Sequence, residues 1–338
     1  MTAGGAAGGE TDVRRGLAHF MERVLAEREK VLAGFEPDPV HDLRVAIRRC
    51  RSLAWGMRLV DPHPGWRRLN RDGRTLFRVL GELRDTQVLM DLVRRIGPKG
   101  DPAGEALAAR LRQEEAGQVP TARGVLAVFP VREGKGLAQA LRPRVRRLEP
   151  DGPFFEYLAA RLLENAFAVH RRALRTRNPV VWHELRIAIK RFRYVVESFL
   201  PRRLARWERP LKSLQDLLGE VHDLHVLWGA LGHLGPVFDA RARSRWRRLV
   251  ERGQRARMRR YRKWMTGRRA HWDVWQGDLP SRAERGRSAR ARRDFWFEYA
   301  DPAPARTRRA AAVALGLADA LAALDAGNVF RSARARRL

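Results

Sequence analysis

The chain has 338 residues, of which 44% are hydrophobic, and it contains one cysteine. A chain of this length and composition can bury a sizeable core in one or two domains, and the single cysteine excludes an internal disulfide. The 69 lysines and arginines against 38 aspartates and glutamates give a formal net charge of +31. This excess indicates a polyanionic partner such as nucleic acid, inorganic polyphosphate or an anionic membrane.

The sequence shows no targeting or membrane-spanning pattern. Residues 1–12 lack the basic and apolar regions of a secretory signal, and no run of about 20 apolar residues occurs. We therefore expect a cytoplasmic protein without a transmembrane segment, in which residues 1–12 are disordered.

Proline and glycine divide the chain into helix-length segments. The predicted helices of the first half cover residues 13–34, the segment up to about residue 60, residues 66–96 and a weaker region at 103–148. The same order starts again near Phe154, with helix breakers at Pro179 and Pro201. No alternating β pattern extends beyond a few residues. These features predict an all-α protein with four helices in each half.

The end of the chain is strongly basic. Residues 241–263 hold twelve Arg or Lys and one Glu, yet Trp246, Leu249 and Val250 keep a helical period. This segment is therefore predicted as a helix with one apolar seam. Residues 281–338 are rich in Arg, Ser and Ala and are expected to form a basic, partly flexible tail with a short amphipathic helix at 310–326.

Two motifs occur twice in the same order. VHDLRVAIRRCR at 40–51 and WHELRIAIKRFR at 182–193 agree at seven of twelve positions, and LGELRDTQVL at 80–89 and LGEVHDLHVL at 218–227 agree at six of ten. The offsets, 142 and 138 residues, differ by about one helical turn. The chain is therefore predicted to be a duplicated domain rather than a short solenoid repeat.

The first motif carries two stripes when read as a helix. The apolar stripes predict core; they are Leu43, Ile47, Cys50, Ala54 and Met57, and in the second copy Leu185, Ile189, Phe192, Val196 and Phe199. Cys50 is accordingly expected to be inert packing. The other stripes are cationic and start with a histidine: His41, Arg44, Arg48 and Arg51, and His183, Arg186, Lys190 and Arg193.

Like charges three or four residues apart repel, and a solvated helix face usually mixes signs. Arg44, Arg48 and Arg51 have no carboxylate at those spacings, although Arg193 has Glu197 four residues on. Repulsion retained in both copies favours an external anion over an ordinary solvated face.

The second motif helix adds more cations and two glycines. Arg74 and Lys212 each precede the shared Gly81 or Gly219 by seven residues, and Arg78 follows Arg74 on the same face. Glycine inside a helix costs about 1 kcal/mol against alanine, so close helix approach is the predicted reason for both glycines. Asp85 and Asp223 are interpreted as partners that orient a cation or a histidine.

This combination resembles the CHAD family, the conserved histidine α-helical domain. The resemblance rests on His41-x-x-Arg44-x-x-x-Arg48-x-x-Arg51, its copy from His183 and the two Leu-Gly-Glu-x-x-Asp segments, and covers roughly residues 13–275. It implies two tandem four-helix bundles related by pseudo-twofold symmetry around a basic central cavity. The implied boundaries are 13–150 for the first bundle and 151–280 for the second.

The resemblance also implies a function. CHAD domains bind inorganic polyphosphate, so this chain is expected to do so without catalysis, cofactor or metal, and to occur at polyphosphate granules. The predicted binding residues are the two cationic stripes together with Arg74, Arg78, Arg84 and Lys212. The second copy has His222 where the first has Arg84, which departs from a strict repeat.

Two other functions remain open at this point. His41-Asp42 and His222-Asp223 spell the pair used by all-α metal-dependent phosphohydrolases, although the repeat replaces them with His183-Glu184 and Arg84-Asp85. A non-specific nucleic-acid or anionic-surface binder would suit the bulk charge, but no helix-turn-helix, zinc finger or stacking set is recognisable. Trp182, Phe192 and Tyr194 are interpreted as packing residues. The sequence leaves the oligomeric state open.

Overall fold

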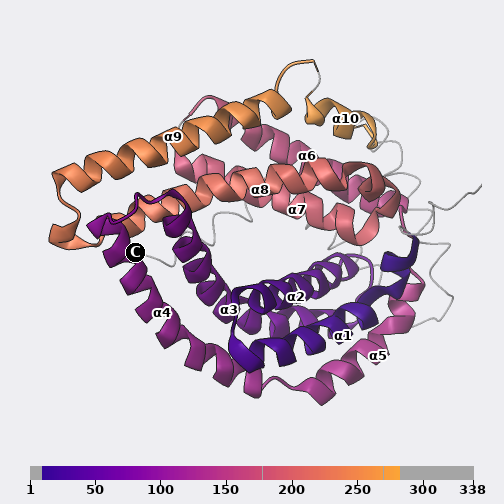
Figure 1. Cartoon of the computed structure of the whole chain (residues 1–338). Coiled ribbons are helices and arrows are strands. Elements are labelled where there is room, and N and C mark those ends of the chain that lie inside the picture. Colours follow the sequence, from indigo (N-terminus) through magenta and orange to yellow (C-terminus); the bar gives the residue numbers. More distant parts are fainter. Residues whose placement is uncertain (1–9, 177, 269, 282–338) are drawn as a thin grey trace, which may run out of the picture.

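The computed structural model describes residues 10–281 apart from residues 177 and 269, and this part of the chain is all-α (Figure 1). The first half comprises α1 (Glu10–Gly34), α2 (Pro37–Met57), α3 (Pro64–Ile96), α4 (Pro102–Ala127) and α5 (Val131–Arg146). The second half comprises α6 (Pro153–Leu174), α7 (Pro179–Phe199), α8 (Pro201–Gly232), the short 3-10 helix η1 (Gly235–Val237), α9 (Ala240–Met265) and α10 (His271–Gly277). The two repeated motifs lie in corresponding helices, α2 with α7 and α3 with α8.

Local sequence explains where the helices begin. Six of the described helices, α2, α3, α4, α6, α7 and α8, start at a proline, whose fixed φ suits the first helical turn and whose missing N–H has no partner there in any case. Side-chain caps add to this, because Asp101, Asn178 and Asp239 accept hydrogen bonds from the backbone of α4, α7 and α9. The predicted breaks around residues 61–65, 179 and 201 are therefore confirmed.

Three sequence predictions need correction. The region 103–148 forms two helices, because Pro130 lacks an N–H and disfavours helical backbone at Phe129, which lies between α4 and α5. The first half therefore has five helices rather than four, and α10 adds a short one to the second half. Helix α1 already begins at Glu10, so residues 10–12 are helical. Residues 1–9 and the tail beyond 281 lie outside the described part.

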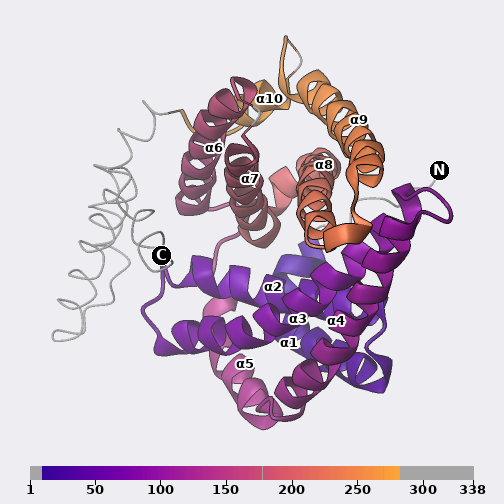
Figure 2. The same ribbon diagram turned by 90° about the vertical axis from the view of Figure 1, so that its left-hand side faces the viewer.

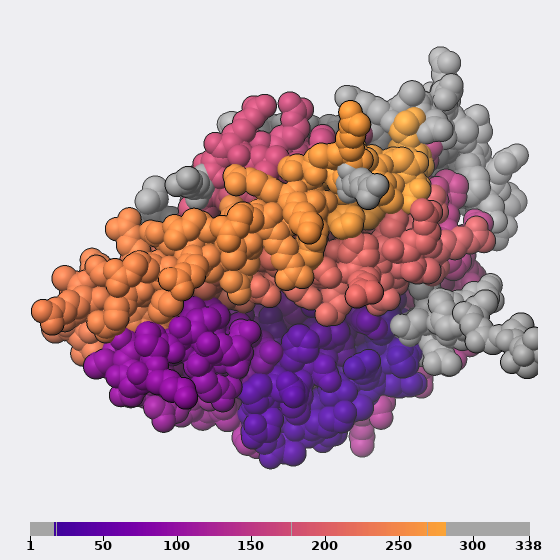
Figure 3. All heavy atoms as spheres, turned by 45° about the horizontal axis from the view of Figure 1, so that its top comes forward, coloured from indigo at the N-terminus to yellow at the C-terminus, as the bar shows by residue number. Residues whose placement is uncertain are grey.

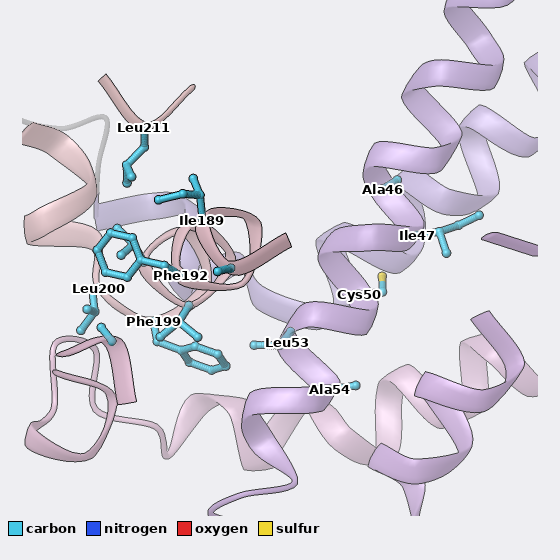
Figure 4. Close-up of a cluster of buried hydrophobic side chains, with 14 of the residues drawn as sticks. Ala46, Ile47, Cys50, Leu53, Ala54, Ile189, Phe192, Phe199, Leu200 and Leu211 are labelled. Atoms are coloured by element: carbon cyan, nitrogen blue, oxygen red, sulfur yellow. The ribbon is translucent and has the colours of Figure 1, made fainter. Parts of the chain in front are cut away.

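The apolar stripes of α2 and α7 form the core, as predicted. All ten stripe residues are buried, and burial raises the pKa of the Cys50 thiol to about 12, which keeps it protonated. The two helices approach closely where a Cβ on Gly56 would lie only 2.2 Å from the Phe199 ring. Figure 4 shows Leu53 on the side of α2 that faces Phe199. This contact joins the two halves.

A second core joins the halves at the other end of the repeat helices. Leu89, Leu92 and Val93 of α3 pack in one cluster with Leu224, Leu227 and Leu231 of α8. Trp246 of α9 belongs to the same cluster and donates a 2.7 Å hydrogen bond from Nε1 to the buried carboxylate of Asp101 at the start of α4. These two contacts place α2 and α3 opposite α7 and α8 (Figure 2).

Candidate anion-binding site

Cations from the two repeats come together where α2 faces α7. Burial, together with the charges of three nearby arginines, lowers the pKa of Lys190 to about 8. Those arginines are Arg186 on the same helix and Arg48 and Arg44 on α2. We refer to Arg44, Arg48, Arg186 and Lys190 as the cationic cluster. All four are half-buried, so water screens their repulsion less than on an open surface.

Tyr194 lies inside this cluster. Its ring centroid is 5.1 Å from the Arg48 guanidinium carbon and 5.8 Å from Lys190 Nζ, within range of cation–π attraction from both sides. Burial raises the pKa of its hydroxyl to about 12. Tyr194 therefore packs against the cations of the cluster and not within the apolar core. Its position four residues after Lys190, on the same helix face, was the signal that could have placed it here.

The first-half arginines reach across α3 at two glycines. Arg44 Nη1 donates a 2.8 Å hydrogen bond to the Phe77 carbonyl, and a Cβ on Gly81 would lie 2.7 Å from that same nitrogen. The side chain of Arg51 passes Gly73, where a Cβ would lie 3.1 Å from its Cγ and Cδ. Both guanidinium groups also lie over the Phe77 ring. Glycine here makes room for an arginine side chain.

The prediction of close helix approach is therefore wrong for both shared glycines. At Gly81 the close neighbour is the Arg44 guanidinium and not a helix backbone, while a Cβ on Gly219 would meet nothing within 4 Å. The two positions are alike in sequence and differ in what surrounds them.

Hydrogen-bond donors in the cluster lack protein acceptors. Arg48 Nε and Arg186 Nε are buried and have no hydrogen-bond partner among the residues that the structure describes, and the same holds for the Tyr194 hydroxyl. A buried polar group left unpaired costs about 1–3 kcal/mol, more if charged. An acceptor from outside the protein would relieve this cost.

Two carboxylates stand near these cations, one from each copy. Asp85 is exposed as a residue, yet loss of hydration around its carboxylate raises its pKa. The positive charges of Arg44 and Arg186 oppose this rise. Burial also raises the pKa of Asp223, to about 6, with Arg186 opposing it. The two acids are thus electrostatic neighbours of the cations, as their interpretation as partners required, and they leave a positive excess.

The two motif histidines lie at the outer ends of the stripes. Loss of hydration lowers the pKa of His41, with Arg84 adding to the effect, and lowers that of His183, with Arg186 and Lys190 adding to it. Both imidazoles are exposed. They are mainly neutral at pH 7, where each offers one N–H donor.

Most of the other predicted site residues have protein partners. Arg193 pairs with Glu197 at 2.5 Å, Lys212 with Asp216 at 3.2 Å and Arg78 with Glu82 at 3.1 Å. Arg84 donates to the Pro37 carbonyl at 3.3 Å. Arg74 is exposed. Its charge lowers the pKa of Arg51, although the burial of Arg51 has the larger effect. Three of these cations, Arg193, Lys212 and Arg78, are therefore partly neutralised by neighbouring carboxylates.

Within residues 10–281 no group of three His, Cys, Asp or Glu is arranged to hold a metal ion. Burial lowers the pKa of the His222 imidazole to about 4. The His222 ring lies 4.9 Å from the His183 ring, and neither belongs to a group of three metal ligands among the described residues. None of the helices in the same range combines the length and apolar character needed to cross a bilayer.

Comparison with known proteins identifies relatives of the chain. The family model described as CHAD domain matches residues 15–232, which is more than half of the chain. A solved CHAD domain from the plant Ricinus communis is 23% identical, with a TM-score of 0.48, over 77% of this chain and 88% of that chain. No curated protein matches the sequence.

Proposed function

The chain belongs to the CHAD domain family, and from this premise we propose that it binds inorganic polyphosphate in the cationic cluster without catalysing a reaction. Binding of this kind would also hold the protein at cytoplasmic polyphosphate granules. The observation that supports the proposal most strongly is the pair of buried Nε donors on Arg48 and Arg186, which come from different halves and have no hydrogen-bond partner in the described part of the chain.

Polyphosphate has the chemistry that these side chains require. Each phosphate along the chain offers charged acceptor oxygens, and hydrogen bonds from guanidinium to such oxygens are about twice as strong as neutral ones. Cations four residues apart on a helix are about 6 Å apart along its axis, so each helix presents its charges in a line. A flexible linear polyanion can follow two such lines at once.

Nucleic acid carries phosphate charges like polyphosphate, but its bases would gain no stacking contact in the cationic cluster. Two aromatic rings contact the cluster and already carry its cations: Arg48 and Lys190 lie against Tyr194, and Arg44 lies over Phe77. Single-stranded nucleic acids usually gain about 1–3 kcal/mol for each base stacked on an aromatic side chain. We therefore propose nucleic acid and other anionic surfaces as weaker, secondary partners.

A titration with polyphosphate tests the proposal. Arg48→Ala with Lys190→Ala removes one arginine and one lysine from the cluster, and should weaken binding at least about tenfold, because each charge-assisted hydrogen bond contributes about 1.5–3 kcal/mol. The matched control is Lys135→Ala with Arg142→Ala, two exposed cations of α5. It should change affinity by less than about threefold at physiological salt.

Salt dependence and competition complete the test. Each lost phosphate contact should lower the slope of log K against log salt by about 0.7–0.9, by analogy with nucleic acids. Single-stranded DNA should displace polyphosphate only at large excess. Equal losses in the two double variants would place binding on the general basic surface instead.

A further inference from the structure

A hollow of about 790 Å³ lies between α7, α8 and α9, next to the cationic cluster. We call it the α9 hollow. Its volume is within the range of about 300–1,000 Å³ that small-molecule sites occupy. His183, the first residue of the second cationic stripe, also lines the hollow. Figure 3 shows α9, in orange, along the outer face of the molecule, and this helix forms one wall of the hollow.

The α9 wall of the hollow is cationic. Arg255, Arg259 and Arg262 line it from one face of the helix. The acid on this wall, Glu251, accepts from Arg247 at 2.9 Å and from Arg255 at 3.2 Å. Arg259 and Arg262 are exposed and show no ion pair among the residues that the structure describes. This wall can therefore bind more than one negative charge.

The opposite wall, from α7 and α8, is lined by apolar side chains and histidines. Its apolar members are Val180, Trp182, Leu218 and Val221. The His183 and His222 rings lie beside them with centroids 4.9 Å apart. Because burial lowers the pKa of both imidazoles, they present neutral aromatic faces at pH 7 rather than charges. A planar ring would find stacking and apolar contact here.

The corresponding place in the first half is bridged by protein contacts. Gln87 occupies the repeat position of His225; it is buried and donates to Phe35 O at 3.1 Å and to Glu115 Oε1 of α4 at 2.9 Å. His225 is instead exposed and lines the hollow. The second copy therefore has an exposed histidine, His225, at the position where Gln87 of the first copy hydrogen-bonds to neighbouring segments.

We propose that the α9 hollow binds a nucleoside polyphosphate, with its phosphates on the arginines of α9 and its base against the imidazole and apolar wall of α7 and α8. Inorganic polyphosphate would use only the cationic wall, whereas a nucleotide uses both. The inference does not depend on polyphosphate binding in the cationic cluster.

The test compares ATP with inorganic triphosphate, each titrated without divalent cation into the full chain. The two probes share a triphosphate and differ in the nucleoside. ATP should bind at least about tenfold more tightly, the gain expected from stacking of one base. Arg259→Ala with Arg262→Ala should weaken both probes, whereas His225→Ala should weaken ATP alone. Lys135→Ala with Arg142→Ala is the matched surface control and should change neither.

The Arg48→Ala, Lys190→Ala variant separates this site from the cationic cluster, because it should keep ATP affinity within about twofold of the wild type. Equal affinities for ATP and triphosphate in this variant, where the cationic cluster no longer competes for triphosphate, would overturn the proposal, since the base would then contribute nothing. So would loss of ATP binding in the Arg48, Lys190 variant, which would place the nucleotide in the cationic cluster. Failure of ATP to bind at all would also overturn it.

Discussion

The two halves carry the same motifs but position their cations differently. In the first half Arg44 and Arg51 reach across α3, past Gly81 and Gly73. In the second half Arg193, the counterpart of Arg51, pairs with Glu197 at 2.5 Å. A repeated cation therefore does not guarantee a repeated role. What decides the role is whether a neighbouring helix leaves room for the side chain or supplies a counter-charge.

The second motif helices differ in a related way. Arg84 of the first half donates to the Pro37 carbonyl, whereas its counterpart His222 lines the α9 hollow. The first copy thus uses this position to tie α3 to the start of α2. The second copy leaves the position beside a hollow that could bind a ligand.

The largest expected effect concerns the contact between halves. Gly56→Ala should destabilise the protein by about 1–3 kcal/mol, because the new Cβ would lie 2.2 Å from the Phe199 ring. The counterpart of Gly56 is Ser198, which is half-buried, and Ser198→Ala should change stability by less than about 1 kcal/mol. Denaturant unfolding measures both; equal effects would show that α2 and α7 can shift freely against each other.

A second comparison uses the shared glycines. Gly81→Ala should displace the Arg44 guanidinium and weaken polyphosphate binding about three- to tenfold, while keeping the fold, because alanine favours a helix by about 1 kcal/mol over glycine. The new Cβ of Gly219→Ala would meet no atom of the described residues within 4 Å, so this variant should leave binding unchanged while it stabilises the protein. Binding titrations that find the two variants alike would contradict a role for the Gly81 contact.

Arg51 and Arg193 give a smaller contrast. Arg51→Gln should weaken polyphosphate binding about two- to fivefold. It should also lower the slope of log K against log salt by about 0.7–0.9, the value for one phosphate contact. Removing the second-half ion pair with Arg193→Gln and Glu197→Gln keeps the net charge and should change affinity less than about twofold. The salt dependence of binding measures both. A larger loss from the second variant would mean that Arg193 binds the ligand.

The smallest effect is a pH dependence confined to the second half. The pKa of Lys190 is lowered to about 8, so its positive charge disappears as the pH rises through 8, and polyphosphate affinity should fall between pH 7 and 9. An arginine side chain in the same position would keep its charge over that range. Lys190→Arg should therefore flatten the profile, and a wild-type profile already as flat as the variant's would contradict the assignment.

Folding stability should respond to pH with the opposite sign. The unfolded chain binds the Lys190 proton more tightly than the folded one, so the contribution of Lys190 to stability rises as the pH increases from about 8 toward the ordinary value of 10.5. The difference between wild type and Lys190→Arg in denaturant unfolding isolates this contribution.

Helix periodicity and duplication were enough to predict the helical class, the buried stripes and the cationic faces of α2 and α7. These features depend on residues close together along one helix. The α9 hollow was missed because it depends on which helices lie opposite each other. Tyr194 could have been placed beside Lys190 from its spacing of four residues on the same helix. The same limit applies to Gly81 and Gly219, which one pattern describes although Arg44 reaches only the first. The division of residues 103–148 into two helices was predictable, because Pro130 disfavours helical backbone at the residue before it.

The central claim is that one polyanion contacts both halves at once, and a double-mutant cycle between Arg48 and Lys190 tests it most directly. Polyphosphate affinity is measured for the wild type, Arg48→Ala, Lys190→Ala and the double variant. We predict a coupling of at least about 0.5 kcal/mol, because the two side chains share Tyr194 and lie in one electrostatic neighbourhood. Additive losses within about 0.3 kcal/mol would contradict the claim and assign the cations to separate sites.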